Sequence, residues 1–132
     1  MTTLIQRRTG GVLLAAVATL VASALYYTVL GTVWQRLSGN ASTSPQAWEI
    51  VVQFGRNVLV AVVLATLLRR LAVTSRRAAL QLGVLVWLGF QAMEVLGSVL
   101  HEHYPFGLYL LHVGDALMTT LIMALILGRK AA

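Results

Sequence analysis

The chain has 132 residues, of which 58% are hydrophobic and only 11% are charged, whereas a soluble domain is typically about 25% charged. This composition excludes a water-soluble globule, because the long apolar stretches leave too few polar residues to cover its surface. The net charge of +6 does not indicate nucleic-acid binding, because the basic residues form short clusters beside apolar stretches. The chain has no cysteine, which excludes disulfides and thiolate chemistry.

Four apolar segments follow one another, and each is long enough to cross a bilayer once. A helix of about 20 residues spans a hydrocarbon layer of roughly 30 Å. We therefore predict an all-α polytopic membrane protein, a single domain forming a four-transmembrane-helix bundle. Ala22-Ser23-Ala24 is a sequence of the kind that signal peptidase cleaves, but the apolar run continues to Trp34, so the first helix is expected to be retained. The predicted helices comprise residues 11–34, 48–68, 78–100 and 107–127.

The basic residues predict the orientation of the chain, because Lys and Arg near helix ends resist translocation. Eight of the ten lie before the first predicted helix, between the second and third, or after the fourth: Arg7, Arg8, Arg69, Arg70, Arg76, Arg77, Arg129 and Lys130. Aromatic residues that favour the membrane interface lie at the opposite helix ends: Trp34, Trp48, Tyr104 and Tyr109. Both termini are therefore predicted to be cytoplasmic in a multi-pass protein of the cell (inner) membrane.

The two halves of the sequence resemble each other. The segment 29–34 at the end of the first predicted helix is similar to 95–100 at the end of the third, and 51–56 aligns with 110–115 in the second and fourth. Glycines and polar residues coincide in these alignments, which favours a duplicated helical hairpin with an axis along the membrane normal. Arg56 and Asp115 would then occupy equivalent positions.

Three charged residues lie inside the predicted helices: Arg56, Glu94 and Asp115. A charged side chain in the bilayer costs at least ~2.5 kcal/mol on insertion scales, so such a placement usually has a reason. All three lie about six to eight residues from the outer helix ends, a depth of about 9–12 Å at the helical rise. Polar neighbours complete a predicted ligand pocket in the outer half of the bundle: Gln53, Asn57, Gln91, His112, Tyr26 and Tyr27.

Two interpretations of this polar group remain open. Arg56 could pair with Asp115 or Glu94 as a buried clamp, because intramembrane polar groups often hold helices together. Alternatively, the helices enclose a pocket, open to the outside, that binds or passes a small polar ligand, a lipid headgroup or an ion. One arginine against two acids leaves a surplus acid, which would attract a cation or a proton.

A metal site is a separate hypothesis for the outer surface. His101, Glu102 and His103, together with His112, offer nitrogen and carboxylate ligands for zinc or a related divalent ion. An ordinary polar turn explains the same segment, since Pro105 follows it. No catalytic triad, phosphate-binding glycine loop or metalloprotease helix motif is present. No cofactor is therefore expected, and the sequence does not indicate an enzyme.

The chain resembles the domain of unknown function 1761 family. The resemblance rests on aromatic, glycine and apolar positions along most of the chain: Tyr27-Thr28, Leu30-Gly31, Trp34, Trp87-Leu88-Gly89-Phe90, Pro105 and Leu108. It implies a small bacterial four-helix membrane protein and supplies no catalytic residues.

The expected function is therefore that of a ligand-binding or ligand-passing membrane protein. The alternatives are a structural or accessory subunit of a larger membrane complex and a metal-dependent membrane enzyme. Small residues along the helices offer flat faces on which a homodimer or a larger complex could form. The other partners that the sequence indicates are the lipid bilayer and the small ligand itself.

Overall fold

The computed structural model describes residues 2–38, 46–103 and 105–128, without the side chains of residues 2–8 and 38. This part of the chain is all-α, as predicted. The predicted flanking residues Tyr104, Arg129 and Lys130 lie outside it. The helices are α1 (Thr2–Val29), α2 (Gly31–Ser38), α3 (Ala47–Arg70), α4 (Arg76–Val86), the π-helix η1 (Trp87–Ala92), α5 (Met93–His101) and α6 (Phe106–Gly128).

Four helical stretches are long and apolar enough to cross a membrane, which confirms the predicted four-span bundle. They are Thr9–Val29, Ala47–Arg70, Arg76–His101 and Phe106–Gly128. The third consists of α4, η1 and α5 in unbroken succession. The loop between the second and third spans ends at Ser75, whose Oγ accepts a hydrogen bond from the Ala78 N–H at 3.1 Å and caps the start of α4.

The first predicted helix, residues 11–34, differs from the structure at its end. The α1 helix ends at Val29, and the chain turns at Leu30 before the short helix α2. Gly31 is a weak helix former, so a change of direction is inexpensive there. The turn lets α2 fold against α6, where the Leu37 side chain lies 2.9 Å from the place that a Cβ on Gly107 would occupy. Trp34 therefore belongs to α2.

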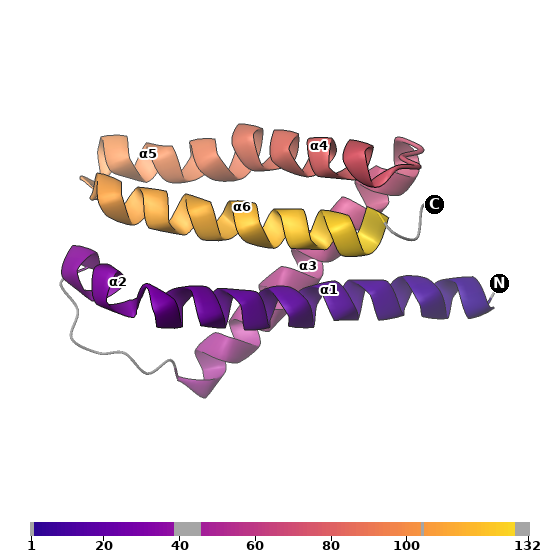
Figure 1. The fold of residues 1–132 in the computed structure, drawn as a ribbon, viewed down its shortest axis with the longest axis horizontal. Coiled ribbons are helices and arrows are strands. Elements are labelled where there is room, and N and C mark those ends of the chain that lie inside the picture. Colours follow the sequence, from indigo (N-terminus) through magenta and orange to yellow (C-terminus); the bar gives the residue numbers. More distant parts are fainter. Residues whose placement is uncertain (1, 39–45, 104, 129–132) are drawn as a thin grey trace.

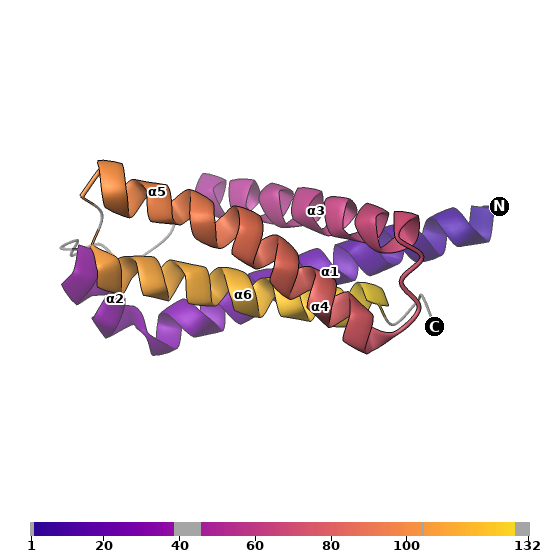
Figure 2. The same ribbon diagram turned by 90° about the horizontal axis from the view of Figure 1, so that it is seen from above.

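The two ends of the bundle differ in the chain segments that lie there. The start of α1, the end of α6 and the α3–α4 loop lie at one end, here called the terminal end, and α2 with the end of α5 and the start of α6 lies at the other, the far end (Figure 1). The α6 helix packs along both α1 and α4, while α3 packs mainly against α1. The α3 helix crosses the bundle obliquely, and its C-terminal end comes close to α4 (Figures 1 and 2).

The main core fills the terminal half of the bundle. Its buried members come from all four spans: Ala15, Ala61, Leu64, Leu68, Ala79, Met123, Ala124 and Leu127. Several are small, and small residues allow helix backbones in a membrane to approach closely. Gly83 likewise faces Ala124 across the α4–α6 interface. The far half contains a smaller cluster of Ala92, Tyr109 and Val113 between the third span and α6.

Candidate functional site

A cleft of about 1520 Å³ occupies the far half of the bundle. All four spans and α2 contribute to its walls, and the predicted pocket residues line it with the exception of Tyr26. Apolar and small residues alternate with polar ones along these walls. The charged and polar lining includes Ser23, Tyr27, Thr28, Glu49, Gln53, Arg56, Asn57, Gln91, Glu94, Ser98, His112, Asp115 and Thr119.

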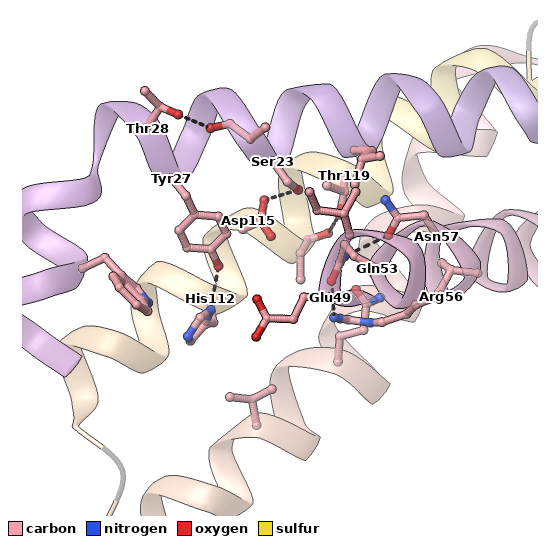
Figure 3. A pocket seen from close by; sticks show the side chains of 18 of the residues that line it. Ser23, Tyr27, Thr28, Glu49, Gln53, Arg56, Asn57, His112, Asp115 and Thr119 are labelled. Atoms are coloured by element: carbon pink, nitrogen blue, oxygen red, sulfur yellow. Dashed lines mark hydrogen bonds between the residues drawn. The ribbon is translucent and has the colours of Figure 1, made fainter. Parts of the chain in front are cut away.

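Hydrogen bonds between α1 and α6 form the back wall of the cleft (Figure 3). The Ser23 hydroxyl donates to Asp115 Oδ1 at 2.7 Å, and the Tyr27 hydroxyl lies 2.6 Å from His112 Nδ1. Ser23 is only 7% exposed, whereas Asp115 and His112 are half-buried. Asp115 thus holds α1 and α6 together while part of its side chain remains open to the cleft.

Tyr26 has a structural position instead of the predicted place in the pocket. Its hydroxyl donates to the Leu111 carbonyl oxygen at 2.8 Å. The same hydroxyl lies 2.9 Å from the place that a Cβ on Gly114 would occupy, so a side chain at Gly114 would displace it. Tyr26 therefore fixes the spacing of α1 and α6 beside the cleft.

A chain of amides forms the α3 wall (Figure 3). Asn57 is 6% exposed and donates to Thr19 Oγ1 on α1 at 3.2 Å. The side-chain Oδ1 of Asn57 accepts a hydrogen bond from Gln53 Nε2 at 3.1 Å. Arg56 is exposed, and its Nη1 donates to Gln53 Oε1 at the long distance of 3.5 Å. The amides of this wall are satisfied by their neighbours, whereas the guanidinium has donors to spare.

The π-helix positions the opposite wall. Near its two ends it is attached to α6, because Trp87 Nε1 donates to the Val113 carbonyl at 2.8 Å and the Tyr109 hydroxyl donates to the Ala92 carbonyl at 3.0 Å. Single turns of π-helix often occur at functional sites. Gln91 in this turn accepts from the Thr120 hydroxyl at 3.1 Å. Two residues after η1, Glu94 is exposed and lines the cleft.

The sequence of the chain matches the family described as "Protein of unknown function (DUF1761)" over residues 11–128. The chain belongs to this family. This confirms the family membership predicted from the sequence. The family description assigns no activity to its members. No curated protein and no solved structure matches it.

The charges in the cleft of this DUF1761 member are not arranged as the clamp hypothesis requires. Among the described side chains, Arg56 forms no ion pair with Asp115 or Glu94, and its one hydrogen bond goes to Gln53. Asp115 is bonded to Ser23 instead. The equal depth predicted from the sequence therefore does not imply contact, because Arg56 and Asp115 lie on different walls.

The predicted metal ligands are also separated. In the described part of the DUF1761 chain, no three His, Asp or Glu residues come together in a group that could hold a metal ion. His101, Glu102 and His103 are exposed at the end of the third span, whereas His112 lies against Tyr27 inside the cleft. The structure therefore gives no support to a metal centre formed by these residues.

Glu49 is a lining residue that the sequence analysis missed. It lies in the first turn of α3, where the Gln46 backbone N–H donates to its Oε2 at 2.9 Å. Its place beside Trp48 at the predicted start of the span made it resemble an ordinary interfacial residue. The spacing of Glu49 could have predicted its place in the cleft. Glu49, Gln53 and Arg56 follow one another at intervals of four and three residues and so share one helix face.

Proposed function

We propose that this DUF1761 member is a multi-pass protein of the bacterial cell membrane that binds a polar ligand or headgroup carrying a cationic group in the far-end cleft. Support comes from the formal charges of the lining. Glu49, Glu94 and Asp115 oppose the one arginine of the lining, Arg56, when the lining histidine His112 is counted as neutral. Such a surplus of carboxylates in a setting of low dielectric attracts cations more strongly than the same groups would in water.

One observation carries the proposal: Arg56 and Glu94 are both exposed on facing walls of the same cleft and do not pair with each other. A charged group within a membrane needs a partner or water. A cleft that holds water and a polar ligand supplies both, whereas lipid chains supply neither. This requirement favours a binding site over an empty groove.

The other polar contacts explain why a purely structural role accounts for only part of the group. Hydrogen bonds through Asn57, Asp115 and Gln91 join α3 to α1, α1 to α6 and η1 to α6. These contacts hold the bundle together, as intramembrane polar groups often do. Neither Arg56 nor Glu94 takes part in these contacts between helices.

The proposal is tested by the charge preference of a thiol placed in the cleft. The chain has no cysteine, so Ser98→Cys introduces a single thiol one helical turn from Glu94 on α5. We expect a cationic thiosulfonate to modify it faster than an anionic one of similar size. The rate ratio should fall when Glu94→Gln is added. If the thiol is not modified, or if the rate ratio is near one and does not change when Glu94→Gln is added, a water-accessible site for cations is excluded.

The orientation has a test of its own. The terminal end includes Arg69, Arg70, Arg76 and Arg77 around the α3–α4 loop, and we propose that this end faces the cytoplasm. We expect an impermeant maleimide added to intact cells to label Glu102→Cys at the far end. The matched variant Thr74→Cys, exposed in the α3–α4 loop, should be labelled only after the cells are opened. The reverse pattern would invert the proposed topology.

A further inference from the structure

One interface expected from the repeated hairpins is largely missing. In a two-fold arrangement, the packing of α1 against α6 would have a counterpart between α3 and the third span. The structure brings α3 close to α4, but in the described part of the chain α3 approaches neither η1 nor α5. The oblique path of α3 explains this, because its N-terminal half runs away from α5 (Figure 1).

The missing interface gives the cleft an opening toward the lipid. Residues of α3 and of α5 both line the cleft although these two helices do not pack together. Ile50 and Val60 on α3 and Val95 on α5 stand among the charged lining residues. The opening therefore combines apolar side chains suited to acyl chains with charged groups on the same two helices.

Arg56 and Glu94 place opposite charges on the two sides of this opening, and Glu49 adds a carboxylate in the first turn of α3. Arg56 lies on α3 and Glu94 on α5, and Asp115 lies on α6 at the back of the cleft. A guanidinium suits a phosphate group because its planar N–H groups can form two parallel hydrogen bonds with it. A carboxylate suits a primary ammonium. A ligand that satisfies both walls at once carries an anionic group that a guanidinium can bind, such as a phosphate, together with an amine.

We propose that the ligand is a phospholipid with an amine-bearing zwitterionic headgroup, which enters the cleft sideways between α3 and α5. This inference rests on the proposed function and specifies its ligand. Arg56 binds the phosphate, Glu94 with Asp115 receives the ammonium, and the acyl chains remain in the gap. Because the charges lie inside the apolar spans, the bound headgroup lies deeper than those of neighbouring lipids.

Native mass spectrometry with added lipid tests the inference. The purified full chain is titrated with phosphatidylethanolamine, with phosphatidylglycerol and with soluble phosphoethanolamine. We expect phosphatidylethanolamine to bind best. Arg56→Gln should weaken both lipids about tenfold, as for the loss of a charge-assisted hydrogen bond. Glu94→Gln should weaken phosphatidylethanolamine by a similar factor and leave phosphatidylglycerol unchanged. Arg36→Gln and Glu102→Gln, which alter exposed far-end charges outside the cleft, should change neither.

The contrary results separate the two proposals. Equal binding of the two lipids by the unaltered chain would remove the amine selection and overturn the inference. If only phosphoethanolamine bound, and its binding were weakened by Arg56→Gln and Glu94→Gln, the ligand would not be a lipid. The inference would then be overturned, but the proposed function would stand. No binding of any of the three in a monomeric protein would overturn the inference, whereas the proposed function would still be decided by the charge preference of the thiol at position 98. A dimer that excludes lipid would show that a second copy covers the opening, which also overturns the inference.

Discussion

Replacing Gly83 by leucine is expected to destabilise the bundle strongly, because it forces a branched side chain into the α4–α6 interface. A Cβ at this position would already lie 3.4 Å from both Ala124 Cβ and Thr120 Cγ2. The remaining atoms of the leucine have no space without moving one helix. Overpacking of this kind typically costs about 1–3 kcal/mol, and the loss should appear as a lower unfolding temperature in detergent.

Gly55→Leu is the matched control for this prediction. Gly55 is exposed on α3, and a Cβ added there would meet nothing within 4 Å. Both substitutions replace a helical glycine by the same better helix former. Equal unfolding temperatures for the two variants would show that α4 and α6 do not pack as described.

The second large effect is expected from Asp115→Arg. This substitution removes the acceptor of the buried Ser23 hydroxyl and adds a second guanidinium to the cleft. The unsatisfied hydroxyl alone should lower the free energy of unfolding by about 1–3 kcal/mol. Arg56→Asp should change it far less, because Arg56 is exposed and has no ion-pair partner among the described residues.

The double exchange of Arg56→Asp with Asp115→Arg decides between this geometry and a clamp. Because the two residues form no ion pair, the changes in unfolding free energy should add except for a weak Coulomb coupling across the cleft. Chemical denaturation of the two single variants and the double variant gives the coupling directly. A double variant clearly more stable than the sum of its parts would mean that Arg56 and Asp115 pair in the membrane.

The architecture was predictable from the sequence because lipid imposes simple lengths. The four apolar stretches had to be helices, and the observed spans extend them by only a few residues at most ends. The turn at Leu30 and the π-helix Trp87–Ala92 were not predictable, because the apolar pattern runs through both without interruption. The hydrogen bond from Trp87 to the Val113 carbonyl is a tertiary contact with no local sequence signal.

The site was predictable in composition but not in pairing. Arg56, Glu94 and Asp115 were conspicuous because charge is rare in apolar spans, and all three line the cleft. Position along a helix says nothing about how far two helices lie apart. Arg56 forms an ion pair with neither acid, and the oblique path of α3 that places it follows from helix packing that no single helix specifies.

Native mass spectrometry of the protein extracted from its own membranes tests most directly whether Arg56 and Glu94 form a ligand site. The proposal predicts a bound small molecule on the unaltered chain and on the control variants Arg36→Gln and Glu102→Gln. It predicts loss of that molecule in Arg56→Gln and in Glu94→Gln, each of which should remain folded because both side chains are exposed. A chain that carries no molecule, or carries it equally in all five proteins, would contradict the proposal.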